Sequence, residues 1–273
     1  MGNYDNAFTI VGFYYIRAKE VEGLIESVKK ACNILKCFSV EDPVLSNLEI
    51  AEKLELSPST THHIVKTLCR EGVLIRDTNR KYRLGWQLME WSNSVMYQQD
   101  IYHKALPFAK ELTEKYVGTV HIGMYDKGDV VFVLRVSSKQ ADYVPTFLGN
   151  RKPAYTTSSG KVLLAFNRSY LQDVIAQGLK KHGPNTITEV IELKKELSTV
   201  KKQGFSISIN ENDTHTYAVA APIQSYSGQT IASVNFVAPT SYMNTINKEQ
   251  LVRHVINLSK ELSREIGYID LLN

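Results

Sequence analysis

One stretch, residues 48–84, constrains the fold of this 273-residue chain more than any other. Its first part, 48–54, has a helical pattern and follows Asn47, a residue suited to an N-cap. A second helix is predicted over 58–70, because Ser57 is a good N-cap residue. The proline that follows suits the first helical position, where an N–H group has no partner. Two short helices this close together indicate a helix-turn-helix.

A hairpin is predicted directly after the second helix. Gly72 is suited to end that helix as a C-cap residue. Residues 73–76 and 81–84 are rich in strand-forming side chains, and the segment between them, Asp-Thr-Asn-Arg, has the chemistry of a turn. A hairpin in this position forms a wing, so the sequence predicts a winged helix-turn-helix domain over residues 25–84.

Polar side chains occupy the face of the second helix opposite its apolar stripe. In a helix-turn-helix the second helix enters the major groove of DNA, and its N-terminal residues face the base edges. The predicted DNA-contacting residues are Ser57, Ser59, Thr60, Thr61, His62, His63, Lys66, Arg80 and Lys81. Hydroxyls and imidazoles can read bases, so Ser59, Thr60 and His63 are expected to contact them. The three cations are expected to contact phosphates.

Charge is divided unevenly along this domain. Residues 57–83 carry six cations and two acids, a local charge of +4, whereas residues 21–56 carry four lysines and seven acids, or −3. The basic charge therefore lies on the helix and wing that would touch double-stranded DNA. Two alternatives are a polar helix face that is merely solvated and a winged helix that binds another protein.

The N-terminal segment, residues 1–24, stands apart from this domain. Its apolar run, 7–16, is too short to cross a bilayer and lacks the features of a signal peptide. The segment is either an arm that packs on a partner subunit or a poorly ordered tail. We expect a cytoplasmic protein with no membrane association.

The three cysteines are too few for a disulfide framework, which fits a reducing compartment. Cys32 falls on the apolar stripe of the first predicted helix, together with Val28 and Phe38, and is expected in the core. No metal is expected, because no standard zinc spacing joins the candidate ligands Cys32, Cys37, His62 and His63.

Beyond the hairpin a linking helix is predicted over 85–102, and the pattern then changes. Strands are predicted over 120–125, 130–136, 204–209, 217–223 and 230–237. Helices are predicted over 106–116, 161–166, 190–203 and 248–266. Turn residues at 127–129 and 227–229 indicate hairpins, and hence antiparallel pairing. Residues 103–273 are therefore expected to form an α+β domain whose helices flank an antiparallel sheet.

Several motifs in combination resemble the IclR transcription regulators. They are LEIA at 48–51, LSPSTTHH at 56–63, LCREG at 68–72, KYRLG at 81–85, SGKVLLA at 159–165, GF at 204–205 and AAPI at 220–223. The resemblance covers about residues 25–268. It implies a GAF-like effector domain at the C-terminal end, a homodimer or dimer of dimers, and no enzymatic activity. Such regulators control operons for the uptake and breakdown of small compounds, often organic or aromatic acids.

The resemblance also implies an effector site built from three segments. By position its residues are Thr157, Ser158 and Ser159, then Ser208 and Ala218, then Asn235, Phe236 and Val237. The hydroxyls and amides of the first segment could bind a carboxylate at a helix N-terminus. Ser208 replaces the usual acid, Ala218 a frequent cysteine and Asn235 a usual serine, which leaves the identity of the effector open.

Two hypotheses that make the C-terminal domain an enzyme are not supported by its residues. The segment before Lys161 resembles a P-loop, but it has Tyr155 where a glycine is required and Val162 where a serine or threonine is required. No G-x-S-x-G nucleophile elbow is present. No catalytic residue or cofactor is expected. We expect a repressor that binds a palindromic operator and responds to a small molecule. The alternatives are a ligand-independent DNA-binding protein and an enzyme domain with a DNA-binding appendage.

Overall fold

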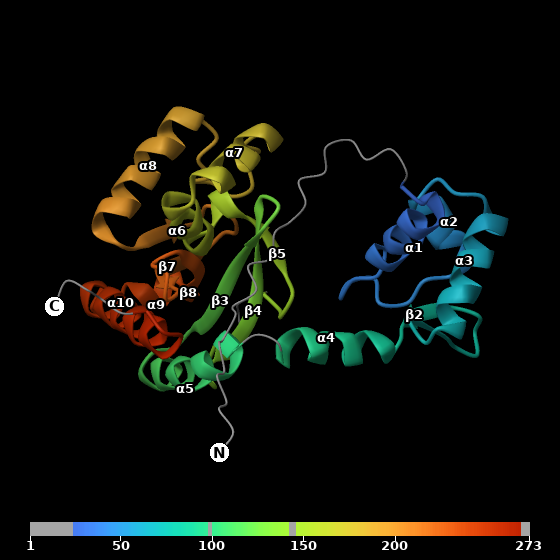
Figure 1. Cartoon of the computed structure of the whole chain (residues 1–273), viewed down its shortest axis with the longest axis horizontal. Coiled ribbons are helices and arrows are strands. Elements are labelled where there is room, and N and C mark those ends of the chain that lie inside the picture. The colour runs from blue at the N-terminus through green and yellow to red at the C-terminus, as the bar shows by residue number, and fades with distance from the viewer. Residues whose placement is uncertain (1–23, 98–99, 142–145, 269–273) are drawn as a thin grey trace, which may run out of the picture. The chain divides into compact units, whose positions relative to one another are not determined.

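The structure is a computed structural model that describes residues 24–97, 100–141 and 146–268. The chain divides into two compact units, Met1–Asn93 and Ser94–Asn273, and each is described by itself (Figure 1). The predicted N-terminal arm, except for Leu24, lies outside the described residues. Within the described ranges, no helix combines the length and the apolar character needed to span a membrane.

The first unit has the helix-turn-helix and hairpin that the sequence predicts. Its elements in chain order are α1 Glu26–Lys36, α2 Asn47–Lys53, α3 Pro58–Arg70, β1 Leu74–Arg76 and β2 Tyr82–Leu84. The next helix, α4 Gln87–Tyr97, begins in the first unit and ends in the second. Ser57 caps α3, as predicted, and its side chain accepts a hydrogen bond from the Thr60 amide. The N-cap of α2 is Ser46 rather than Asn47. Ser46 forms a capping box with Glu49, which satisfies two amides at once.

The core of this unit differs from the predicted stripe on α1. Ile34 is the fully buried residue of that helix and packs with Val65 of α3 and Leu74 of β1. Cys32 is exposed, so the prediction that it lies in the core is wrong. Val28 is also 56% exposed. Val28 and Cys32 are both exposed because they lie on the side of the helix away from Ile34. Only the end of the predicted stripe, Phe38, is buried.

The second unit is built on a six-stranded sheet. Its strands are β3 Thr119–Asp126, β4 Asp129–Ser137, β5 Arg151–Pro153, β6 Ser206–Ile209, β7 Thr216–Gln224 and β8 Thr230–Pro239. Their order in the sheet is β5-β4-β3-β8-β7-β6, and every neighbouring pair is antiparallel. The five strands predicted from the sequence all occur, whereas the short β5 was not predicted.

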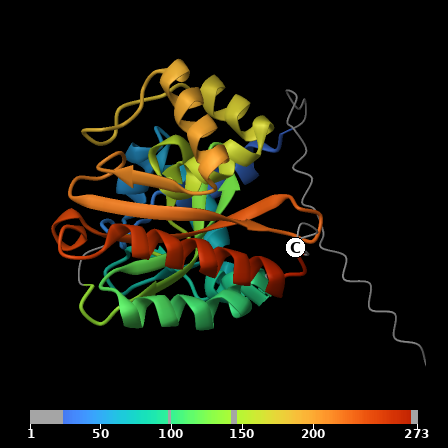
Figure 2. The ribbon, with the colours of Figure 1, turned by 90° about the vertical axis from the view of Figure 1, so that its left-hand side faces the viewer.

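Helices cover both faces of this sheet (Figure 2). One face carries α5 Asp100–Lys115 and α10 Lys248–Glu265, and the other carries α6 Ser158–Phe166, α7 Arg168–Gln177 and α8 Val190–Gln203. Two short helices, η1 Ala154–Thr156 and α9 Thr240–Met243, complete the unit. The helix predicted to begin at residue 106 begins at Asp100, because Ile101 and Ala105 extend its buried stripe by one turn.

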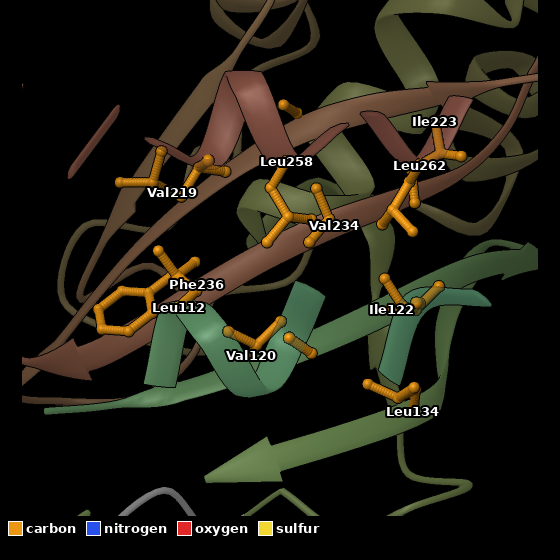
Figure 3. Close-up of a cluster of buried hydrophobic side chains, with 14 of the residues drawn as sticks. Leu112, Val120, Ile122, Leu134, Val219, Ile223, Val234, Phe236, Leu258 and Leu262 are labelled. Atoms are coloured by element: carbon orange, nitrogen blue, oxygen red, sulfur yellow. The ribbon is translucent and has the colours of Figure 1, made fainter. Parts of the chain in front are cut away.

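Alternate residues of β8 face the two helical layers. Val234 and Phe236 are buried in the apolar cluster that α5 and α10 cover (Figure 3). Asn235, between them, points to the opposite face and lies within hydrogen-bonding distance of Ser158 in α6. This period of two follows from the pleat of a strand. Strand β8 therefore has one apolar side, in the cluster under α5 and α10, and one side on which a polar side chain is buried under α6.

Candidate functional site

The surface of α3 offers the side chains expected at DNA. Ser57, Ser59, His62, His63 and Lys66 are exposed, and Thr60 is half-buried. The Ser57 hydroxyl donates a hydrogen bond to Thr60 Oγ1 at 2.8 Å, so these two hydroxyls form one unit at the start of the helix. The face therefore combines oriented hydroxyls with imidazoles and a cation.

Thr61 is the exception on this helix. Its side chain is fully buried, and its hydroxyl donates to the Ser57 carbonyl at 3.2 Å. Thr61 lies four residues before the buried Val65, which places both on the inner face. The prediction that Thr61 contacts DNA is wrong.

The wing is a tight hairpin with its cations outside. Asp77 holds the turn, because its carboxylate accepts a hydrogen bond from the Lys81 amide at 2.8 Å. Arg80 has a positive φ of 62° at the tip and is exposed. The Lys81 ammonium lies 3.8 Å from a Glu49 carboxylate oxygen, and both side chains are nearly half exposed. Exposed pairs of this kind contribute little, so both cations are available to phosphates.

The two imidazoles of α3 contact each other edge to face. The His62 and His63 rings are 6.1 Å apart and nearly perpendicular. In the described parts of the chain, no group of three His, Cys, Asp or Glu side chains could hold a metal ion.

The second unit contains a pocket beneath the N-terminal end of α6. It encloses about 500 Å³ of space between atoms, its open mouth included. The residues that line it are His121, Phe132, Thr146, Lys152, Thr156, Thr157, Ser158, Ser208, Asn212, Asp213, Thr216, Ala218, Asn235 and Val237. The structure thus brings together six of the eight positions to which the family resemblance assigns the effector site.

The other two of those positions do not line the pocket. Phe236 points to the α5 and α10 face, so its assignment to the effector site is wrong for its side chain. Ser159 is fully buried beside Gly123 of β3, at which an added Cβ would lie 3.2 Å from Ser159 Oγ. Its place in the site is likewise not supported.

The N-terminal end of α6 presents hydrogen-bond donors to the pocket. Thr157 caps the helix, because its hydroxyl oxygen accepts from the Gly160 amide at 3.0 Å. Ser158 follows as the first helical residue and is fully buried. The first amides of a helix lack acceptors within it and carry the positive end of its dipole. This end of the pocket therefore suits an anion or another hydrogen-bond acceptor.

A neutral hydrogen-bonded chain crosses one wall of the pocket. His121 Nδ1 lies 3.2 Å from Asn235 Oδ1, and His121 Nε2 lies 3.0 Å from Thr146 Oγ1. Burial lowers the pKa of His121 to about 4, which keeps the ring neutral. The amide oxygen can only accept, so Nδ1 carries the proton and Nε2 accepts from Thr146. The Asn235 amide nitrogen, 3.5 Å from Ser158 Oγ, then donates to Ser158.

Among the described residues that line the pocket, the charged side chains are Lys152 and Asp213, and both lie at its more exposed end. The Lys152 ammonium lies 3.3 and 3.5 Å from the two carboxylate oxygens of Asp213. Asn212 donates to the same carboxylate at 2.6 Å.

The sequence analysis did not single out Lys152, because the position of Lys152 depends on the pairing of β5 with β4. His121 did leave a signal, since it is a polar residue between Val120 and Ile122 in a predicted strand.

Comparison with known proteins identifies the architecture. Residues 93–264 match the family model "Bacterial transcriptional regulator IclR C-terminal", and residues 27–78 match the "IclR helix-turn-helix domain". The chain belongs to the IclR family.

Three known proteins are similar to this chain over most of its length. The HTH-type transcriptional regulator XynR of Escherichia coli is 28% identical over 90% of this chain and 98% of its own length. The p-hydroxybenzoate hydroxylase transcriptional activator of Acinetobacter baylyi is 28% identical over 90% and 92%. A crystal structure of an IclR homologue from Microbacterium hydrocarbonoxydans, complexed with 4-hydroxybenzoate, superposes with a TM-score of 0.78. It is 23% identical and covers 88% of this chain and 98% of its own, so it supports the fold.

IclR-family members are DNA-binding transcription regulators and not enzymes. Lys161, the residue that suggested a P-loop, has a structural role here. Its side chain is 1% exposed, and its ammonium donates to Glu196, Glu211 and the Ile207 carbonyl at 2.7 to 2.9 Å. All three donors are used, so none is left for a phosphate.

Proposed function

We propose that this IclR-family regulator represses an operon for the uptake or breakdown of a small organic acid, and that the acid binds beneath α6. The observation that carries the proposal is the pocket itself. A helix N-terminus, a buried neutral histidine and an amide converge on it beside apolar side chains such as Phe132 and Val237. A few oriented polar groups within an apolar cavity are typical of small-molecule sites.

The DNA side of the proposal rests on the first unit. Its exposed α3 face and basic wing are suited to a major groove and its phosphates, and DNA in the cytoplasm is the proposed partner. One such helix reads only a few base pairs. A specific affinity therefore calls for a homodimer, or a dimer of dimers, on a palindromic operator with half-sites about one helical turn apart or a multiple of it.

The names of similar proteins suggest a ligand class. One relative is the p-hydroxybenzoate hydroxylase transcriptional activator, and one structural neighbour was crystallised with 4-hydroxybenzoate. Aromatic carboxylates are therefore the first compounds to test. The positive end of α6 would favour an anionic ligand, and the ring of Phe132 would pack against its aromatic body.

A binding titration on DNA tests this function. DNA from the region upstream of the gene, labelled with a fluorophore, is titrated with the full chain, with and without 4-hydroxybenzoate and related acids. For a repressor, one acid should weaken binding by about fivefold or more, the range of common allosteric couplings. A thermal-shift screen distinguishes a ligand-binding regulator from the alternative, a ligand-independent DNA-binding protein. No compound in the panel would stabilise the latter.

A further inference from the structure

The charged pair at the pocket mouth has no part in the function proposed above. The side chains of Lys152 and Asp213 are 24% and 39% exposed, whereas Ser158 and Asn235 at the closed end are 0% and 4% exposed. The pocket therefore has a neutral, buried end and a charged end that solvent reaches. A ligand that fills it meets both.

The contact between Lys152 and Asp213 is loose. Its N–O distances, 3.3 and 3.5 Å, exceed the 2.7 to 2.9 Å that Lys161 makes to its three acceptors in the same unit. Charge-assisted hydrogen bonds between ammonium and carboxylate groups are normally about as short as those of Lys161. An ammonium has three donors, so Lys152 has capacity for a further acceptor.

Asp213 does not depend on Lys152 for a partner. The Asn212 amide donates to its carboxylate at 2.6 Å, and the Asn212 amide oxygen is in turn 3.0 Å from Thr156 Oγ1. Asp213 can keep this short hydrogen bond if Lys152 turns to another acceptor. The pair can therefore open at little cost.

We propose that Lys152 is the specificity-determining residue that binds the carboxylate of the ligand, which replaces Asp213 at its ammonium. This inference rests on the proposed function, because it needs the ligand to occupy this pocket. The positive end of α6 lines the same pocket and reinforces the preference for an anion. Asp213 competes with the ligand for Lys152, and this competition excludes weakly acidic or neutral compounds.

Matched pairs of ligands test the charge preference. Calorimetry on the full chain measures benzoate against benzamide, 4-hydroxybenzoate against 4-hydroxybenzamide, and propionate against propionamide. Members of a pair have nearly the same shape and differ in charge. At least one acid should bind about tenfold or more tightly than its amide, the effect of one charge-assisted hydrogen bond.

Four variants assign that preference to Lys152. In Lys152→Met the acid should lose about tenfold in affinity while the amide changes less than twofold, and Lys152→Arg should restore most of the loss. Asp213→Asn should tighten acid binding, because the competitor has lost its charge. Lys195→Met removes an exposed lysine of α8 and serves as the control, with no change expected.

Three results would overturn the inference. They are unchanged acid affinity in Lys152→Met, a preference for amides in every pair, and the absence of binding by every acid. The proposed function is judged separately by DNA affinity. A neutral compound that binds the pocket and shifts DNA affinity would leave that function standing while this inference fails.

Discussion

The imidazole Nδ1 of His121 lies 3.2 Å from the amide oxygen of Asn235, and this contact orients the hydrogen bonds along one wall of the pocket. Both residues are buried, on the neighbouring strands β3 and β8. The chain of donors runs from Thr146 through His121 and Asn235 to Ser158 only while the ring is neutral. The wall is therefore sensitive to protonation.

The burial of His121 predicts that the stability of the protein depends on pH. The pKa of His121 is lowered from 6.5 to about 4, so between these values the unfolded chain binds a proton that the folded protein does not. The free energy of unfolding should therefore decrease as the pH is lowered through this window. The decrease from pH 7 to pH 5 should be about 2 kcal/mol for this residue alone. Urea unfolding at both pH values, followed by circular dichroism, should show a smaller fall in His121→Gln. An identical fall in the two proteins would contradict the assignment.

The wing predicts a general loss of DNA affinity when a cation is removed. Arg80→Ala should weaken binding to every DNA sequence and flatten the logarithmic salt dependence by about one unit of slope. Asn79→Ala, in the same turn, removes no charge and is the control. Fluorescence anisotropy over a series of salt concentrations measures both. A change in sequence preference, with the salt slope unaltered, would show that Arg80 does not contact phosphate.

Two neighbouring threonines should behave differently. Thr60→Ala removes a hydroxyl from the DNA face and should change the preference between operators. Thr61→Ala removes a buried, hydrogen-bonded side chain and should lower the free energy of unfolding by about 1–2 kcal/mol without changing that preference. Selection of bound sequences from a random pool, together with urea unfolding, distinguishes them. Altered preference in Thr61→Ala alone would reverse the assignment.

The buried lysine predicts a large stability effect. Lys161→Met leaves Glu211 buried opposite an apolar side chain and should cost about 3–5 kcal/mol. Burial already raises the pKa of Glu211, a shift that Lys161 opposes. The double variant Lys161→Met, Glu211→Gln should regain part of the loss, because no buried charge is then unpaired. A double variant no more stable than the single one in urea unfolding would contradict this account.

Local signals explain why the first unit could be predicted closely. Ser57, Pro58 and Gly72 mark the ends of α3 through capping chemistry that acts within a few residues. The error at Cys32 arose because several apolar stripes fit one short helix, and only packing decides that Ile34 faces inward. Such a choice is made by tertiary contacts and not by the sequence pattern alone.

The pocket was predictable only in part, because non-local pairing builds it. The family resemblance placed Ser158 and Asn235 correctly, but it did not separate Asn235 from Phe236, which lies on the other face of the same strand. Lys152 lies in a strand of three residues that no periodicity reveals. Its meeting with Asp213, 61 residues away, depends on the folded sheet.

The central claim is that a ligand beneath α6 controls the affinity for DNA, and one titration tests it most directly. Operator DNA is titrated with the full chain and with Ser158→Leu, each with and without the acid that binds most tightly. The unchanged protein should shift its DNA affinity by about fivefold or more on adding the acid. Ser158→Leu should bind DNA as well as the ligand-free protein and show no shift, because leucine fills the pocket. An equal shift in both proteins would contradict the account.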